Sequence, residues 1–551
     1  MNYCVSPSHS VGPEAMQGMV TAPHYLAAQA GLDILRRGGN AVDAAIATAA
    51  VLSVVYPHMC TLGGDNFWLI FDSATQTLRG LNASGRAAAR ASMEYYAEKG
   101  LSRIPSRGWD SAITVPGAVS GWDEAFRFAR ETMRRGLPWC ELFASAIAYA
   151  RHGCPVSTSL AQLSAVNATP DETGIRFLQR FPELARIFFP GGRALRQGTI
   201  LRQPDLACTL ESLAQGGAAE FYTGAFARAV AEDMARNGGL LSLEDFATHR
   251  AGWVKPLSVN YRDFSACNLP PNTQGLASLE ILNILQNFDV QSLGESSADC
   301  VHAIVEATKE AFLDRDAWVS DPDFVQAPLD VLLSPEHGKR QAARLDMRRA
   351  GTPLALLDPH GDTVWLGVVD GDGNAVSLIQ SIYHDFGSGI VPAGTGVLLQ
   401  DRGCFFSLRP GHVNALEPGK RTMHTLNPAM LLKDGKPWLV YGTMGGEGQP
   451  QTQAAMITRI VDFGMTPQEA IAAPRWLYGR AWGAECNDLR LEGRFAQEVF
   501  EELKRRGHRV NRVEDYAHTM GHAGAIRIDA ETGLLQGGCD PRSDGLSAVG
   551  Y

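Results

Sequence analysis

Residues 362–380 read DTVWLGVVDGDGNAVSLIQ, two apolar runs on either side of a turn. The first run, Val364 to Asp370, has the composition of a buried strand, and Ala375 to Gln380 predicts a second one. The DGDGN sequence between them is rich in residues that favour tight turns. The segment therefore predicts a β-hairpin with Thr363 at the head of its first strand. Taken alone, this Thr is an ordinary strand residue, because Thr has good strand propensity.

The rest of the chain predicts helices and further hairpins. Residues 41–55 are almost wholly apolar, which predicts a helix buried on all sides, with Asn40 as its N-cap. Most of residues 110–350 are predicted to be helical. A buried strand is expected at 67–71, further hairpins at 429–441 and 525–537, and further helices at 24–37, 142–151, 301–318, 454–463 and 497–506. Blocks of helices alternating with hairpins predict sheets covered by helices in one large compact unit.

Composition excludes several classes of protein. The 551 residues include 49 Lys plus Arg and 59 Asp plus Glu, a formal net charge of −10, which argues against nucleic acid as a partner. We expect no membrane span, because no stretch of about 18 apolar residues lacks charges. The first residues lack a basic segment and an apolar run, so we expect no secretory signal and a cytoplasmic protein. The 10 Cys are scattered without a CxxC pair, which predicts reduced core thiols, with Cys404 as a candidate reactive thiol.

Common cofactor and metal motifs fail on inspection. The DGDGN turn begins like an EF-hand loop but lacks the required Gly and the final Glu. Asp314, Asp316, Asp321 and Asp323 have no His near them at ligand spacing, so solvated or capping carboxylates are expected. There is no GxxxxGK[ST] loop and no GxSxG elbow, which argues against a P-loop ATPase and an α/β-hydrolase. We expect no metal and no organic cofactor.

Many segments together resemble the gamma-glutamyltransferase family of the N-terminal-nucleophile hydrolase superfamily. These segments are GGNAVDAAIATAAVLSVVYPHMCTLGGDNF (38–67), VPGAVSGW (115–122), GGLLSLEDF (238–246), LEILNILQNFDV (279–290), DTVWLGVVDGDGNAVSL (362–378), FGSGIVPAGTGVLL (386–399), KRTMHTLNPAMLLKDGKPWLVYGTMGGEG (420–448), TPQEAIAAPRW (466–476) and CDPRSDGLSAVGY (539–551). The resemblance implies an α+β fold, the four-layer αββα sandwich of that superfamily.

The resemblance also implies a catalytic apparatus. Thr363 matches the family's nucleophile, and the chain is expected to cleave itself between Asp362 and Thr363 into a large chain, 1–362, and a small chain, 363–551. Cleavage frees an α-amino group on Thr363, whose ordinary pKa of about 7.7–8.0 suits a general base. Ser381 matches a hydroxyl that supports the nucleophile, and the paired Gly445 and Gly446 match the oxyanion donors, although two adjacent Gly can equally form a turn.

The sequence departs from true gamma-glutamyl enzymes at the positions that hold the donor's head group. Tyr383, Arg402 and Phe405 replace an Asn, a Gln and an Asp, and His424 and Thr425 replace a Ser pair. The family's early Arg falls near Ser92, so Arg86 or Arg90 is the candidate to reach the site. The acid that would neutralise a glutamyl ammonium is therefore absent, while a cation has been gained. This pattern, with LQDRGCFFSL (399–408) and NTQG (272–275), resembles the amidohydrolase and acylase branch, which includes oxamate amidohydrolase.

The functional hypothesis is a self-processing amidohydrolase that cleaves an amide of a small carboxylate-bearing molecule, with oxamate as the best guess and water as co-substrate. The first alternative is a gamma-glutamyltransferase or glutathione hydrolase. The second is an uncleaved binding protein on the same fold, against which the presence of Thr363, Ser381 and the paired glycines argues.

Overall fold

The hairpin predicted around residues 370–374 lies at the centre of the structure, which is a computed structural model. It describes all residues except 1–11, 169–179, 354–361, 480–486 and 546. Strand β10 (Asp362–Val369) pairs antiparallel with β11 (Ala375–Tyr383). Asp370 holds the turn, because its carboxylate accepts hydrogen bonds from the backbone N–H groups of Asp372 and Asn374 at 3.0 Å.

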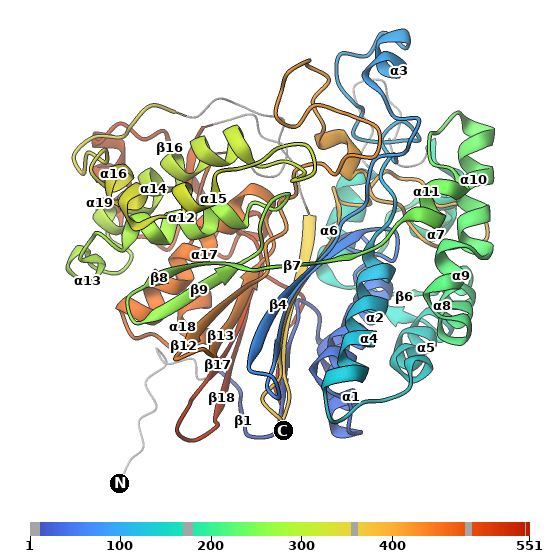
Figure 1. Ribbon diagram of the computed structural model, residues 1–551, viewed down its shortest axis with the longest axis horizontal. Coiled ribbons are helices and arrows are strands. Elements are labelled where there is room, and N and C mark those ends of the chain that lie inside the picture. Colours follow the sequence, from blue (N-terminus) through green and yellow to red (C-terminus); the bar gives the residue numbers. More distant parts are fainter. Residues whose placement is uncertain (1–11, 169–179, 354–361, 480–486, 546) are drawn as a thin grey trace.

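Two antiparallel seven-stranded sheets form the middle of the molecule (Figure 1). Sheet I contains, in spatial order, β19 (Ala548–Gly550), β2 (Met19–Thr21), β10, β11, β3 (Asp65–Asp72), β4 (Thr77–Ala83) and β7 (Gly252–Val254). Sheet II contains β1 (Glu14–Ala15), β18 (Leu535–Cys539), β17 (Ala523–Ile528), β13 (Lys436–Thr443), β12 (Ala429–Lys433), β9 (Phe264–Asn268) and β8 (Leu257–Tyr261). The hairpins predicted at 429–441 and 525–537 are both in sheet II.

Alternation of side chains along β10 shows how the layers stack. Val364, Leu366 and Val368 belong to the core shared with one helical layer, whereas Trp365 and Val369 belong to the core between the two sheets. The glycines of sheet II make room for the large indole. A Cβ atom on Gly442 or Gly524 would come within 2.3 or 2.5 Å of the Trp365 ring. The two sheets therefore pack closely along this strand.

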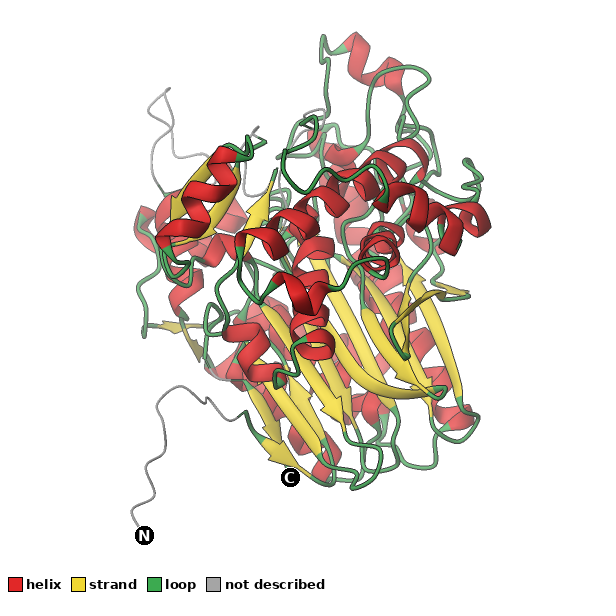
Figure 2. Ribbon diagram, turned by 90° about the vertical axis from the view of Figure 1, so that its left-hand side faces the viewer, coloured by secondary structure: helices red, strands yellow, loops and turns green. Residues whose placement is uncertain are grey.

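Helices cover the outer faces of both sheets, as the turned view in Figure 2 also shows. Sheet I is covered by α1 (Tyr25–Arg36), α2 (Ala41–Val55), α4 (Ala118–Thr132), α5 (Ala144–His152) and α8 (Pro204–Gly216). Sheet II is covered by α12 (Gly275–Leu285), α14 (Ala298–Trp318), α17 (Gln449–Ile457), α18 (Pro467–Ala472) and α19 (Gln497–Arg505). This arrangement is the αββα sandwich that the resemblance implied.

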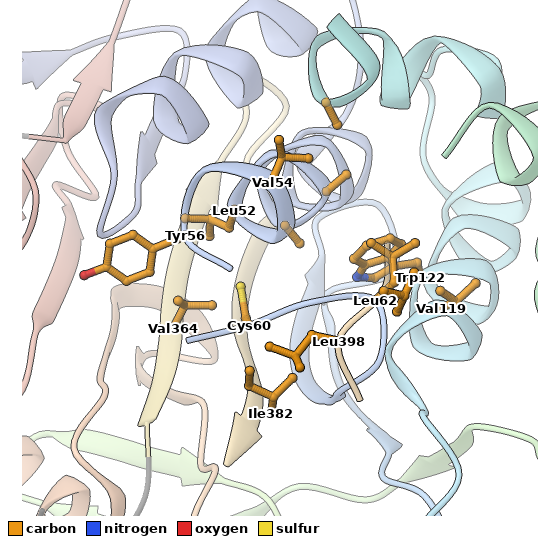
Figure 3. Packing of buried hydrophobic residues seen from close by; sticks show 14 of the residues in the cluster. Leu52, Val54, Tyr56, Cys60, Leu62, Val119, Trp122, Val364, Ile382 and Leu398 are labelled. Atoms are coloured by element: carbon orange, nitrogen blue, oxygen red, sulfur yellow. The ribbon is translucent and has the colours of Figure 1, made fainter. Parts of the chain in front are cut away.

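Helix α2 is the centre of the layer on sheet I. All of its residues are buried, and Asn40 caps it by accepting a hydrogen bond from the Asp43 backbone N–H at 2.9 Å. Figure 3 shows Leu52 and Val54 of this helix above Val364 of β10 and Ile382 of β11. The start of β10 is thus fixed from outside by an apolar helix.

Smaller elements complete the described chain. They include α3 (Met93–Glu98), α6 (Thr158–Asn167), α7 (Pro182–Phe188), α9 (Ala218–Tyr222), α10 (Ala225–Asn237), α11 (Leu243–Thr248), α13 (Val290–Leu293), α15 (Leu329–Leu332), α16 (Pro335–Ala342), β5 (Cys154–Pro155), β6 (Ile200–Leu201) and the sheet of β14 (Trp476–Tyr478), β15 (Leu489–Glu492) and β16 (Val510–Val513).

Two sequence expectations need correction. Residues 252–268 form strands β7, β8 and β9 inside the segment predicted to be mostly helical. These strands are short and only partly buried, so their hydrophobic pattern is weak. Cys140 and Cys208 are exposed, so not all of the described cysteines are core thiols.

Candidate functional site

Thr363 lies fully buried where β10 begins, in an irregular part of the ladder. The register pairs Asp362 with Tyr383 and Val364 with Gln380, so β11 has one extra residue opposite Thr363. Alternation along β10 places the Thr363 side chain on the Trp365 face, between the two sheets. Its Oγ1 has no hydrogen-bond partner among the described residues. The Asp362 side chain lies outside the described residues.

Strand β11 brings Ser381 and Tyr383 to the same end of sheet I. The Ser381 hydroxyl oxygen accepts a hydrogen bond from the Tyr383 backbone N–H at 2.8 Å. This contact accompanies an unusual backbone, because Tyr383 has φ +81°, in the left-handed region that non-glycine residues rarely adopt. The strained residue is the last one of β11 and pairs with Asp362, next to Thr363.

Gly445 and Gly446 form a turn directly after β13, a strand of sheet II that packs against β10. Their φ angles are +125° and +54°, which glycine adopts at little cost. The turn is supported from α12, because the Gln274 side-chain amide donates hydrogen bonds to the carbonyl oxygens of Gly446 at 2.9 Å and Thr425 at 2.7 Å. Gln274 therefore joins the glycine turn to the segment that carries His424 and Thr425.

Arg315 holds Gln274 in place. Its guanidinium is fully buried and donates to the Gln274 amide oxygen at 3.2 Å and to the Glu447 carboxylate at 3.0 Å. Sequence reasoning missed both supporting residues. Gln274 lies in the quoted NTQG segment, whereas nothing in the local sequence singled out Arg315.

Arg402 is a buried cation in the short helix η4 (Arg402–Phe405), 1% exposed. Its Nη2 donates to the Thr425 hydroxyl at 3.2 Å, but its Nε and Nη1 have no partner within the described chain. Burial lowers the pKa of the guanidinium. Arg402 therefore does not point into solvent, and it forms no ion pair with a described carboxylate. Nε and Nη1 together carry three N–H groups, and such unpaired donors on a buried cation can bind an anion.

Two aromatic rings flank this guanidinium. The Arg402 Cζ lies 3.8 Å from the centre of the Tyr383 ring and 5.8 Å from that of Phe405. The two rings meet edge to face with their centres 5.7 Å apart. Since Tyr383 faces Asp362 across the ladder, the stack places Arg402 near the start of β10.

His424 lies beside Thr425 and contacts a carboxylate that sequence reasoning missed. Its Nε2 is 3.2 Å from Asp65 Oδ2, and its buried Nδ1 has no partner among the described residues. Burial and the charge of Arg402 lower the pKa of His424 well below its ordinary value, so the imidazole is neutral. Burial raises the pKa of Asp65 to about 7.

Neither early arginine joins this cluster. Arg86 forms ion pairs with Asp321 at 3.0 Å and Asp323 at 2.6 Å, whereas Arg90 donates to the carbonyl oxygens of Gly239 and Leu240. Neither Arg86 nor Arg90 therefore adds a second cation beside Arg402. Asp321 is fully buried and therefore not solvated, but it does cap a turn, because its Oδ1 accepts a hydrogen bond from the Asp323 backbone N–H at 3.1 Å.

Cys404 is partly buried beside Arg402, with its Sγ 4.0 Å from His384 Nδ1. His384 also binds the Asp401 carboxylate through its side chain and its backbone N–H. This group lies at the edge of the cluster formed by Arg402, Tyr383 and Phe405.

Similarity to known proteins identifies the family of this chain. A family model described as gamma-glutamyltranspeptidase matches residues 27–550. The chain is 47% identical over 532 residues to the glutathione hydrolase-like YwrD proenzyme of Bacillus subtilis (strain 168), covering 97% of this chain and 98% of that protein. It is 46% identical to the oxamate amidohydrolase proenzyme of Klebsiella pneumoniae, covering 97% and 98%. The crystal structure of a cephalosporin acylase from Bacillus halodurans superposes with a TM-score of 0.89 at 38% identity, covering 100% and 99%.

The αββα sandwich with these neighbours defines an N-terminal-nucleophile hydrolase. The chain belongs to the gamma-glutamyltranspeptidase family, and it is an amidohydrolase enzyme. No described helix is long and apolar enough to cross a membrane.

Proposed function

We propose that the precursor cleaves itself between Asp362 and Thr363. The Thr363 hydroxyl oxygen attacks the Asp362 carbonyl carbon, and the peptide nitrogen leaves as the new α-amino group of Thr363. Water then hydrolyses the resulting ester, which releases the large chain 1–362 and the small chain 363–551. The buried, unpartnered Oγ1 of Thr363 supports this role, because no described hydrogen bond withholds the hydroxyl from reaction.

The mature enzyme then hydrolyses a short amide that carries a free carboxylate and no α-amino group. The observation that carries this proposal is Arg402, a buried cation whose Nε and Nη1 have no described partner and can donate to a carboxylate. Tyr383 and Phe405 shorten the space beside the guanidinium, which favours a small molecule. An ammonium group would lose its hydration there without gaining the acid that Phe405 replaces. Thr425 and the neutral His424 add hydrogen-bonding groups for a small anion.

The chemistry follows from these positions. Arg402 holds the carboxylate, and the freed amine of Thr363 takes the proton as Oγ1 attacks the amide carbon. The backbone N–H groups of Gly445 and Gly446 stabilise the negative oxygen of the intermediate. The amine leaves with a proton, and water hydrolyses the acyl-enzyme ester. With oxamate the products are oxalate and ammonia. The residues act without a metal or organic cofactor.

Glutathione hydrolysis is the second candidate, favoured by the name of the Bacillus subtilis relative. An uncleaved binding protein is a third reading, and the unengaged Thr363 hydroxyl argues against it.

Two matched substrate pairs test the proposal. Oxamate and oxamide differ by the carboxylate, and glutaramate and glutamine differ by the α-amino group. We expect kcat/KM to be highest for oxamate, much lower for oxamide, and lower for glutamine than for glutaramate. Faster hydrolysis of glutathione or gamma-glutamyl-p-nitroanilide than of oxamate would favour the glutathione hydrolase instead.

A further inference from the structure

Glu280, in the middle of α12, is a fully buried acidic residue that no step of the proposed reaction uses. Its carboxylate oxygens Oε1 and Oε2 are both buried, and no described N–H or hydroxyl group donates a hydrogen bond to either. A buried carboxylate without a donor is strongly unfavourable, so a proton or a cation must neutralise it.

Side chains from two neighbouring helices meet Glu280. Asp314 of α14 and His337 of α16 each offer a ligand atom, and the three atoms lie within 4.8 Å of one another. His337 Nε2 is 2.7 Å from Asp314 Oδ2. The amide nitrogen of Gln341 donates to the same Asp314 oxygen at 2.9 Å, and the amide oxygen of Gln341 is buried without a described partner.

We propose that Glu280, Asp314 and His337 bind a first-row divalent cation such as Zn²⁺ or Mn²⁺. Two carboxylates supply the negative charge, and the imidazole favours these ions over Mg²⁺ and Ca²⁺. Small side-chain rotations open the His337–Asp314 contact to the spacing of two ligands. Rotation of the Gln341 amide turns its oxygen inward as a fourth ligand. No His stands at ligand spacing from these carboxylates in the sequence, but the fold brings His337, 23 residues from Asp314, into contact with it.

The site is reachable from solvent. The side chains of His337 and Asp314 are 13% and 23% exposed, whereas Glu280 lies at the buried end. A cation can therefore enter between α14 and α16 and meet the unpartnered carboxylate last.

A second described cluster of similar composition is already satisfied. His302 binds His508 at 2.8 Å and the Asp346 carbonyl oxygen at 2.9 Å. Glu306 accepts hydrogen bonds from Lys309 at 2.7 Å and the Gly351 backbone N–H at 2.9 Å. The Lys309 ammonium supplies the positive charge, so this cluster needs no cation.

The cation would join three helices of the layer on sheet II. Asp314 directly precedes Arg315, which holds Gln274 at the start of α12 and, through it, the glycine turn. Binding is therefore expected to stabilise the helical layer behind that turn, without a part in the chemistry itself. The competing explanation is a proton on Glu280 that is hydrogen-bonded to Asp314, since burial, the charge of Asp314 and a side-chain hydrogen bond to Asp314 raise the pKa of the Glu280 carboxyl.

Thermal unfolding of tag-free, chelator-treated protein tests the site. We expect one Zn²⁺ or Mn²⁺ per chain by elemental analysis after dialysis, and a melting temperature raised by about 2–5 °C at a hundredfold excess over Kd. Glu280→Gln and His337→Gln should each abolish the bound metal and the shift, because each removes a ligand. Glu280→Gln need not lower the metal-free melting temperature, since it also removes the buried acid.

Two control variants complete the design. His152→Gln, at an exposed position of α5, and His508→Gln, in the second cluster, should keep both the bound metal and the shift. The proposal is overturned if the wild type takes up no stoichiometric metal. It is also overturned if the metal still raises the melting temperature of Glu280→Gln and His337→Gln. The same holds if this rise is lost in His508→Gln but retained in His337→Gln.

Discussion

The Arg402 guanidinium is buried and forms no ion pair with a described carboxylate. In the proposed function, its charge is therefore available to the carboxylate of a substrate. Replacing it by Leu should raise KM for oxamate by about 10- to 100-fold, the range expected for hydrogen bonds to a charged group. Self-cleavage should be unaffected, since it uses the protein's own chain. Steady-state kinetics and a denaturing gel measure the two effects.

The same substitution at Arg409, which is exposed on the following loop, is the control and should leave KM unchanged. An Arg402→Leu enzyme with wild-type KM for oxamate would contradict the assignment of the carboxylate site.

The turn at Gly445 and Gly446 offers a second test at a single residue. Val at position 446 would be strained at φ +54° and would reorient the backbone N–H groups. Loss of one oxyanion donor typically lowers kcat by about 10²–10³-fold. Gly446→Val should therefore lower kcat strongly in a folded protein. Gly411→Val has a similar φ of +76° in open space and should retain activity. A normal kcat in Gly446→Val would move the oxyanion site elsewhere.

Sequence reasoning named residues that lie near Thr363, the proposed nucleophile, but missed the residues that hold them in place. Arg402, Tyr383 and Thr425 were found because they replace other residues at positions that the resemblance assigns to the family's head-group site. Asp65 and Arg315 were missed, because their contacts join segments far apart in the chain and leave no local pattern. The local sequence indicates which residues belong to the site, whereas such long-range contacts determine how these residues are arranged.

At the scale of elements, strong periodicity was the reliable guide. Helix α2 lies at the predicted bounds, because its apolar run and its Asn40 cap are both local signals. The hairpin of β10 and β11 was predicted for the same reason. Strands β7 to β9 were missed. Each of these strands is short, and β7 and β8 lie at the edges of their sheets. Packing against neighbouring strands therefore decides their conformation more than their own sequence does.

Asp65, in strand β3, has a raised pKa, and this predicts that the stability of the protein depends on pH. Burial raises its pKa from 3.8 to about 7, so the folded protein holds this proton more tightly than the unfolded chain does. Its stabilising contribution is full below about pH 4 and is lost as the pH rises towards 7. Asp65→Asn removes this titration while keeping an oxygen for the backbone N–H groups of Gly85 and Gly117.

Melting temperatures at pH 5 and pH 8 check this effect. The decrease from pH 5 to pH 8 should be smaller in Asp65→Asn than in the wild type. Asp529→Asn, on a loop outside the core, is the control. It should leave the decrease in melting temperature from pH 5 to pH 8 unchanged. An identical decrease in Asp65→Asn would show that Asp65 does not titrate in this range.

The whole molecule interleaves the two proposed chains. In sheet I, β10 of the small chain pairs with β2 of the large chain on one side, and β11 pairs with β3. In sheet II, β12 of the small chain pairs with β9 of the large chain. The fragments should therefore stay together after cleavage. Size-exclusion chromatography should give one peak without denaturant, and two separate native peaks would contradict this arrangement.

Intact-mass analysis of purified protein tests the central claim most directly, that Thr363 is both the cleavage point and the nucleophile. The wild type should give two masses that correspond to residues 1–362 and 363–551. Thr363→Ala should give one unbroken, inactive chain, whereas Thr363→Ser, which keeps a hydroxyl, should still be cut. A fully active wild type with a single 551-residue mass, or a Thr363→Ala protein cut at the same bond, would contradict the account.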